Sequence, residues 1–178
     1  MEERLEKKFQ IIQSERVFLR PATDDDIEDM LDWMQHNEVV KFLQQEITVE
    51  YITHLCIQTS GLYAIILKST ERCIGNIQIN VLSEQDVTIG YALNRAYWQQ
   101  GYMSESLQGL LEYLFQELHV WDVAASVYSD NFSSLKLLNN CGFTYIGSTT
   151  IKGKSCKNFI LINKKKKKSS NKEKRQSS

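Results

Sequence analysis

One stretch of the chain, residues 86–115, constrains the fold more than any other. It begins with a β-prone run, continues through a short loop that contains Gly101, and ends in a long amphipathic segment. In that last segment apolar residues recur three, four and seven positions apart, which is the spacing of a helix buried on one face. A loop that delivers backbone N–H groups to the start of a helix suits an anion, most often a phosphate. We therefore expect a strand–loop–helix unit with an anion site at Gly101.

The length and composition of the chain fit one α/β or α+β domain. With 178 residues, 42% of them hydrophobic, and a single proline, the chain can bury a core and is too apolar to be disordered. The first ten residues are charged and lack the apolar centre of a signal peptide, and no apolar run is long enough to span a bilayer. The four cysteines are too widely spaced for a zinc motif. We therefore expect a reduced, cytoplasmic protein without a membrane span or a metal site.

The charge of the chain is divided between an acidic body and a basic tail. Residues 164–178 carry eight basic residues and one acidic residue, whereas residues 1–163 carry 13 basic and 21 acidic residues, a net charge of −8. We expect residues 1–163 to form a single domain and residues 164–178 to be a solvated, disordered tail. The alternative for the tail is a contact of its lysine run with RNA or acidic lipid headgroups. The acidic body favours a cationic small molecule or a basic peptide over nucleic acid as the main partner.

The hydrophobic pattern predicts a mixed sheet with helices around it. Residues 62–67 are a nearly continuous apolar run, as expected of a strand buried on both faces. Thr23 is expected to cap the first helix, with three aspartates in the first turn, where the helix dipole favours them. The expected strands are 17–20, 62–67, 73–81, 87–93, 122–128, 143–146 and 159–162. The expected helices are 23–34, a region in two pieces at 38–44 and 49–58, about 103–118, and 133–140.

These elements and their motifs, in this order, resemble the GCN5-related N-acetyltransferase (GNAT) superfamily. The signature loop of that family corresponds here to residues 98–103, WQQGYM. The resemblance covers roughly residues 15–162 and implies a GNAT fold, a mixed and mostly antiparallel central sheet of about seven strands flanked by about four helices. Further similar motifs are NFSS at 131–134, CGF at 141–143, VFLRP at 17–21 and IGY at 89–91, and the last two match the RimJ/RimL-like branch of ribosomal-protein acetyltransferases.

The resemblance implies an N-acetyltransferase that moves an acetyl group directly from acetyl-CoA to a primary amine. The loop amides would hold the pyrophosphate of coenzyme A, the backbone at Leu93 would pair with its pantetheine arm, and the side chain of Asn131 would contact it. The acceptor would be a protein N-terminus or a small cationic amine, and the protein a monomer or a homodimer. The implied cofactor-binding residues are Leu93, Gln99, Gln100, Gly101, Tyr102, Met103, Ser104 and Asn131.

The sequence marks the proton-transfer residues less clearly. Ser134 stands where the similar branch offers a hydroxyl group to the leaving thiolate, and its other interpretation is a first-turn residue of a short helix. Tyr128 is a further phenol at the end of a strand. Thr88 and Leu138 occupy positions where family members often carry a glutamate and a tyrosine. These two departures leave a non-catalytic acyl-CoA-binding module as the alternative function.

Acceptor choice is expected to depend on the N-terminal helices and on the loops at 37–50 and 149–155. Residues 32–34 with Glu38, Phe42 and Glu46 would form an aromatic and acidic wall for a cationic amine, or would pack as helices with a solvated acidic face. None of the three histidines has the sequence context of a catalytic pair. We therefore interpret His36, His54 and His119 as structural or exposed residues.

Overall fold

The computed structural model describes residues 10–43, 46–58 and 61–164, and contains one eight-stranded sheet in the order β1-β2-β3-β4-β5-β6-β8-β7. The expectations for residues 1–9 and for the tail beyond Lys164 lie outside the described residues. The strands are β1 (Ile12–Gln13), β2 (Val17–Pro21), β3 (Leu62–Leu67), β4 (Cys73–Val81), β5 (Asp86–Leu93), β6 (Asp122–Tyr128), β7 (Thr144–Ile151) and β8 (Lys154–Ile162). The helices are α2 (Ile27–Met34), α3 (Asn37–Val40), α4 (Val49–Gln58), α5 (Tyr102–Gln116) and α6 (Phe132–Asn140), with 3-10 turns η1 (Asp24–Asp26) and η2 (Arg95–Tyr97).

The mixed, mostly antiparallel sheet predicted from the sequence is confirmed. β5 and β6 form its parallel pair, and the other neighbouring strands pair in antiparallel fashion. The expected sheet had about seven strands, and the eighth is the two-residue strand β1, which pairs with β2. Among the described residues, no helix has the length and hydropathy needed to cross a lipid bilayer.

Both faces of the sheet are covered, and β3 is buried along its whole length as a result. Tyr63, Ile65 and Leu67 belong to the core shared with α5 and α6, whereas the alternate residues of β3 belong to the core shared with α2 and α4. Alternating side chains of a strand point to opposite faces, so one strand serves two cores. This arrangement explains the nearly continuous apolar sequence of residues 62–67.

The acidic run before α2 has a more specific role than the expected dipole interaction. Asp26 is buried and accepts two hydrogen bonds from the Arg20 guanidinium, at 2.6 Å and 2.8 Å. The backbone N–H of Thr23 also donates to Asp26 Oδ2, at 2.9 Å. Asp26 therefore ties the end of β2 to the start of α2. No group of three or more His, Cys, Asp or Glu within the described ranges could hold a metal ion.

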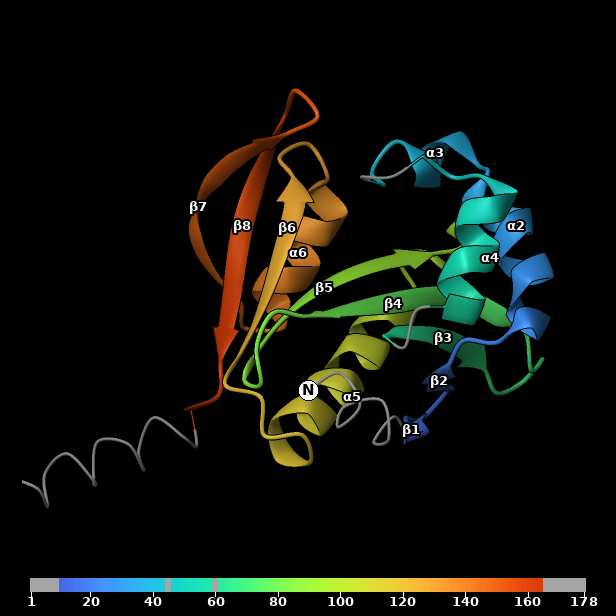
Figure 1. Cartoon of the computed structure of the whole chain (residues 1–178), viewed down its shortest axis with the longest axis horizontal. Helices are drawn as coiled ribbons and strands as arrows, with labels where there is room; N and C mark the ends of the chain where they lie inside the picture. The colour runs from blue at the N-terminus through green and yellow to red at the C-terminus, as the bar shows by residue number, and fades with distance from the viewer. Residues whose placement is uncertain (1–9, 44–45, 59–60, 165–178) are drawn as a thin grey trace, which may run out of the picture.

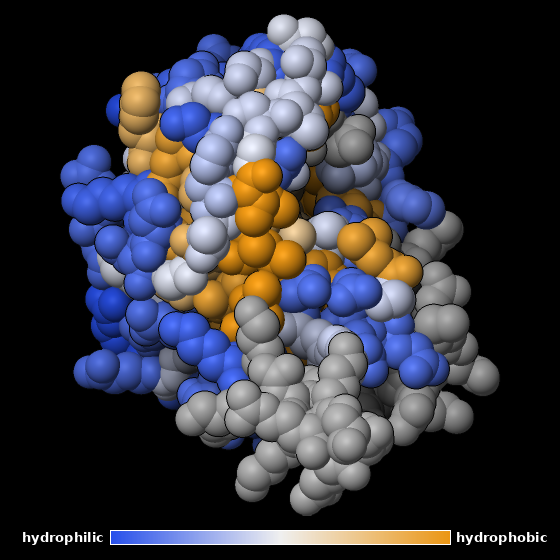
Figure 2. Space-filling view, turned by 90° about the vertical axis from the view of Figure 1, so that its left-hand side faces the viewer, coloured by the Kyte–Doolittle hydropathy of each residue, from blue (hydrophilic) through white to orange (hydrophobic). Residues whose placement is uncertain are grey.

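The C-terminal hairpin is longer than predicted. The sequence suggested short strands at 143–146 and 159–162 joined by a polar loop, but β7 and β8 pair along their length and turn at Lys152 and Gly153, both with positive φ. Positive φ at two central residues matches the twist of a tight hairpin. β7 is an edge strand whose side chains are mostly exposed, so its residues do not alternate between apolar and polar. Figure 2 looks at this side of the molecule and shows apolar side chains among the polar ones.

Candidate active site

The candidate site lies where β5 and β6 separate. The two strands pair at only three positions, and the last of these joins Thr88 and Ala124. β5 then continues to Leu93 and β6 to Tyr128 as the strands spread apart (Figure 1). The gap opens at the carboxyl ends of two parallel strands, which is where open α/β sheets bind their ligands.

The predicted anion-binding loop lies between η2 and α5. Gln99 and Gly101 have positive φ values of 60° and 84°, and Gly101 is the N-cap of the 15-residue helix α5. The backbone N–H groups in the first turn of α5 therefore point out of its N-terminal end, which is where anions bind to helices. Met103 belongs to the first turn of α5. Its side chain is buried in the core, so it packs away from the open side of the loop.

An arginine that was not singled out in the sequence braces this loop. The Arg16 side chain donates to Glu105 Oε2 at 2.8 Å and to the Gln100 carbonyl oxygen at 2.9 Å. Its guanidinium also lies 4.4 Å from the centre of the Tyr102 ring. Arg16 and Glu105 are 89 residues apart, so no local pattern in the sequence could connect them. The charge of Arg16 is paired with Glu105, so the role of this arginine is to hold the loop in place at the start of α5.

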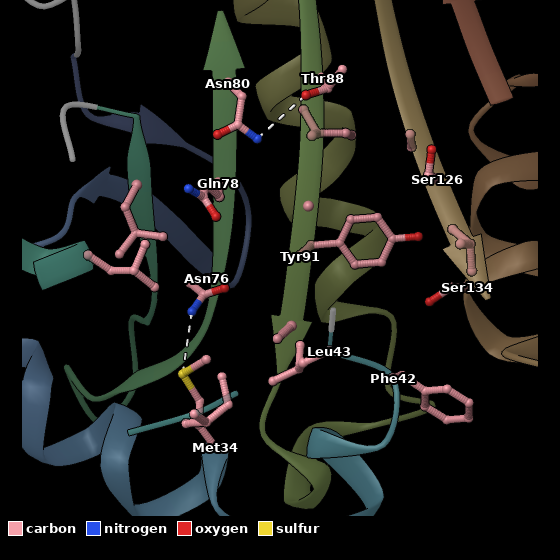
Figure 3. A pocket seen from close by; sticks show the side chains of 18 of the residues that line it. Met34, Phe42, Leu43, Asn76, Gln78, Asn80, Thr88, Tyr91, Ser126 and Ser134 are labelled. Atoms are coloured by element: carbon pink, nitrogen blue, oxygen red, sulfur yellow. Dashed lines mark hydrogen bonds between the residues drawn. The ribbon is translucent and has the colours of Figure 1, made fainter. Parts of the chain in front are cut away.

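A cavity of about 560 Å³ extends from the β5–β6 gap to the helices α2–α4. Its floor includes Asn76, Gln78 and Asn80, which alternate along β4 and share one face of the strand (Figure 3). The Asn76 amide nitrogen lies 3.8 Å from the sulfur of Met34, and the Asn80 amide lies 3.5 Å from Thr88 Oγ1. No Asp, Glu, Lys or Arg lines the cavity in the part of the chain that the structure describes. The described lining is therefore polar, with no carboxylate, lysine or arginine, and His54 is its one histidine.

Two of the predicted site residues, Asn131 and Ser134, line this cavity. Asn131 is the N-cap of α6, where its Oδ1 accepts a hydrogen bond from the Ser134 backbone at 3.2 Å. Its amide nitrogen is therefore the group that could reach a ligand. Tyr128 also lines the cavity, with the Lys154 amine 5.2 Å from its ring centre.

The other predicted site residues are placed outside the cavity lining. Gln99 to Ser104 form the loop and the first turn of α5, and Leu93 ends β5. The carbonyl oxygen of Leu93 accepts a hydrogen bond from the Trp98 indole at 2.8 Å, which fixes the start of the loop against the strand. His54, which was expected to be structural or exposed, is an exposed residue that lines the cavity.

The acidic wall considered for a cationic acceptor is not formed. Trp33 is buried in the core of α2 and α4, and Glu38 pairs with Arg95 at 2.5 Å. Met34 and Phe42 do reach the cavity, but Asp32, Glu38 and Glu46 are not among its lining residues. The helices are therefore packed with a solvated acidic face, the second of the two alternatives. Asn76, Gln78 and Asn80 take the place of that wall, and their only signal in the sequence was the alternation within residues 73–81.

Comparison with known families decides the relationship of the chain. The sequence profile described as "Acetyltransferase (GNAT) domain" matches residues 16–144. The chain belongs to the GNAT family. As a GNAT enzyme it is an acyltransferase, and it transfers an acetyl group from acetyl-CoA to an amine. The predictions of family, fold class, reaction and acyl donor are confirmed.

Curated relatives agree with this assignment. The GNAT chain is 28% identical over 147 residues to the uncharacterized N-acetyltransferase p20 of Bacillus licheniformis, covering 76% of this chain and 83% of that protein. It is 27% identical over 147 residues to the uncharacterized N-acetyltransferase YoaA of Bacillus subtilis (strain 168), with the same coverage.

Solved structures show the same fold. A GNAT-family acetyltransferase from Bacillus anthracis superposes with a TM-score of 0.80 at 20% identity, over 86% of this GNAT chain and 99% of that one. RimL, described as a ribosomal L7/L12 α-N-protein acetyltransferase, superposes with a TM-score of 0.75 at 19% identity, over 86% of this chain and 94% of its own.

Proposed function

We propose that this enzyme acetylates the α-amino group of a peptide or protein. The observation that carries the proposal is a cavity whose described lining has no carboxylate, lysine or arginine, and in which side-chain amides from β4 lie beside β5, the strand that borders the gap. Side-chain amides both donate and accept hydrogen bonds, so they can pair with the peptide groups that follow an N-terminal amine. The amine itself would lie toward the gap, next to the thioester.

A polycationic acceptor fits this cavity less well. Desolvating a charged amine without an opposite charge is unfavourable, and binding several charges would require carboxylates in the wall. The cavity has none among its described lining residues. An α-amino group carries a single charge, which it loses before reaction.

The ionisation of the acceptor supports the same choice. An α-amino group has a pKa of about 8, compared with about 10.4 for a lysine-type amine, so a useful fraction is already neutral near pH 7. An uncharged cavity lowers the amine pKa further, because burial disfavours the charged form. Such an acceptor does not need a strong general base, which agrees with Thr88 standing where the family often has a glutamate.

On the donor side, we propose that acetyl-CoA lies in the gap between β5 and β6. The residues suited to hold it are the amides of the loop Gln99–Ser104, the backbone at Leu93 and the amide nitrogen of Asn131. Gly101 at φ 84° and the start of α5, held in place by the Arg16 contact to the Gln100 carbonyl oxygen, are the features that suit a pyrophosphate. Bound there, acetyl-CoA supplies an activated acyl group, and the surrounding residues orient it toward the acceptor cavity.

Structures of the same fold include acetyltransferases described by this class of acceptor. RimL is one, and a ribosomal-protein-S5-alanine acetyltransferase from Vibrio fischeri is another, with a TM-score of 0.74 and 16% identity over 87% of this chain and 97% of its own. The cytoplasmic location, the monomeric or homodimeric state and the division into residues 1–163 and 164–178 stay predictions.

The experiment is a comparison of three acceptors at pH 7, with thiol release from acetyl-CoA as the measurement. The acceptors are a peptide with a free N-terminus and one internal lysine, the same peptide with a blocked N-terminus, and a linear polyamine. We expect kcat/KM for the free peptide to exceed both others by at least about tenfold. Equal or faster reaction with the polyamine would contradict the proposed acceptor class.

A further inference from the structure

We propose that Tyr91 supplies the proton that the sulfur of coenzyme A takes up when the acetyl group leaves, either directly or through Ser134. The proposal rests on the placement of acetyl-CoA in the β5–β6 gap. It does not depend on which amine is the acceptor.

The geometry singles out this phenol. Tyr91 lies on β5 beyond the last residue paired with β6, and its ring crosses the gap toward Ser134 (Figure 3). Both residues line the cavity. The Tyr91 hydroxyl group is buried and makes no well-formed hydrogen bond within the described residues, and the Ser134 hydroxyl is close enough to act on its pKa. A buried hydroxyl group without a partner is costly, and it marks a position at which a ligand can complete the hydrogen bond.

The usual location for such a phenol is filled by an apolar side chain. Leu138, where family members often have a tyrosine, is fully buried in the core, and Tyr91 packs against the same core. The phenol is therefore delivered from the strand and not from the helix. Ser134 lies on the helix at the opposite side of the gap and is able to relay a proton between the phenol and a ligand.

The chemistry balances with these groups alone. The amine nitrogen forms a bond to the carbonyl carbon, the carbon–sulfur bond breaks, and its electron pair leaves on the sulfur. Tyr91 donates its proton to that sulfur, or Ser134 donates its own proton and takes the one from Tyr91. The proton lost by the amine nitrogen passes to water, and the phenolate recovers a proton from water.

The surroundings keep the phenol protonated. Burial raises the pKa of Tyr91 well above its ordinary value of 10.0, the nearby Ser134 hydroxyl lowers it by a smaller amount, and Cys141 adds a small upward effect. The same dry gap disfavours a thiolate, because burial penalises its charge. The raised pKa keeps the phenol protonated until the acetyl group leaves, and the penalty on a buried thiolate is what favours transfer of the proton to the sulfur.

The test uses Tyr91→Phe, which removes the hydroxyl group and keeps the ring. We expect kcat to fall about 100-fold, a typical value for the loss of a proton donor, with little change in KM for acetyl-CoA. The deficit should narrow as the pH rises past about 8.5, the ordinary pKa of a thiol, because the thiolate then needs no proton to leave. Tyr113→Phe is the matched control, since it removes another partly buried phenol hydroxyl on α5, outside the cavity lining.

Two measurements separate this proposal from the choice of acceptor. Hydrolysis of acetyl-CoA without any amine needs the same proton, so Tyr91→Phe should slow it to a similar extent. The ring signal of Tyr91 in the NMR spectrum of isotope-labelled enzyme should shift when coenzyme A is added. The proposal is overturned if kcat and hydrolysis in Tyr91→Phe stay within about threefold of wild type. It is also overturned if the Tyr91 signal does not respond to bound coenzyme A.

Discussion

Gly101 is the residue at which the backbone of the proposed donor loop can be tested most sharply. Its φ of 84° is in the left-handed region, and an added Cβ would lie 3.2 Å from Arg16 Nη2. Gly101→Val should therefore lower the free energy of unfolding by about 2 kcal/mol, the cost of such strain, and should weaken coenzyme A binding about tenfold. Urea unfolding and calorimetric titration measure the two effects. Gly90→Ala is a control for stability alone, because no atom lies within 4 Å of its added Cβ.

Glu105 provides a pH-dependent test of the brace behind the loop. Burial favours a higher pKa for its carboxyl group, but hydrogen bonds from Arg16 and Val17 outweigh burial and lower the pKa below its ordinary 4.5. A lowered folded pKa means that the stabilisation is complete above about pH 4.5 and is lost as the pH falls through the folded pKa.

We therefore expect Glu105→Gln to cost about 1 kcal/mol at pH 7, allowing for the partial exposure of Arg16. The difference from wild type should shrink as the pH falls below 4.5, in urea unfolding at a series of pH values. A difference that stays constant with pH would show that the ion pair does not brace the loop.

For single residues, the sequence revealed those that belong to motifs but not those that only the fold brings together. Ser134 and Asn131 were found because they follow a strand within a recognisable pattern. Tyr91 alternates with Val87, Ile89 and other core residues of its strand, so it was indistinguishable from a core residue until the divergence of β6 was known. Arg16 was missed for the same reason, since its partner is distant in the chain.

Among the elements, the start of the β5–β6 pair carries an unfavourable charge arrangement. Asp86 and Asp122 are directly paired in register. Burial and the neighbouring Asp86 raise the pKa of Asp122 above its ordinary value of 3.8. A raised folded pKa means that the protonated Asp122 carboxyl adds to the free energy of unfolding. This contribution is complete below about pH 3.8 and is lost as the pH rises through the folded pKa. At pH 7 the pair therefore destabilises the protein.

Asp122→Asn should raise the free energy of unfolding at pH 7 by about 0.5 kcal/mol, after allowing for solvent screening. The gain should shrink as the pH falls through the folded pKa of Asp122, which lies above 3.8, because the wild-type carboxyl then takes up a proton. Glu84→Gln, an exposed acid in the adjacent turn, is the matched control and should change little. Loss of stability in Asp122→Asn at pH 7 would contradict the interpretation of this strand pair.

The elements that the sequence predicted well are those with two-sided burial or a clear helical stripe. β3, β4 and β6 have the expected limits, and α5 follows its apolar stripe. β7 and β8 were predicted too short because residues 147–158 contain only two apolar side chains, Ile151 and Cys156, which are too few to show the period-2 alternation of a strand. The hairpin is longer because β8 pairs with β6 on one side and with β7 on the other, which the local sequence pattern does not reveal.

For the whole molecule, the acidic body and the basic tail are expected to act separately. Deleting residues 165–178 should leave the melting temperature within about 2 °C of the full-length value, because this segment has no apolar side chain to bury. Acetyl transfer to a short peptide should also be unchanged, which initial rates at low and high salt would measure. A collapse of activity with an intact fold would show that the tail takes part in catalysis.

The central claim is that an uncharged cavity directs the acetyl group to α-amino groups. The most direct measurement is mass spectrometry of a cell extract that is incubated with the enzyme and isotope-labelled acetyl-CoA, against an extract without enzyme. We predict that the label enters peptide and protein N-termini, and that lysine side chains, polyamines and amino sugars stay unlabelled. Enzyme-dependent label on polyamines or amino sugars, with unlabelled N-termini, would contradict the claim.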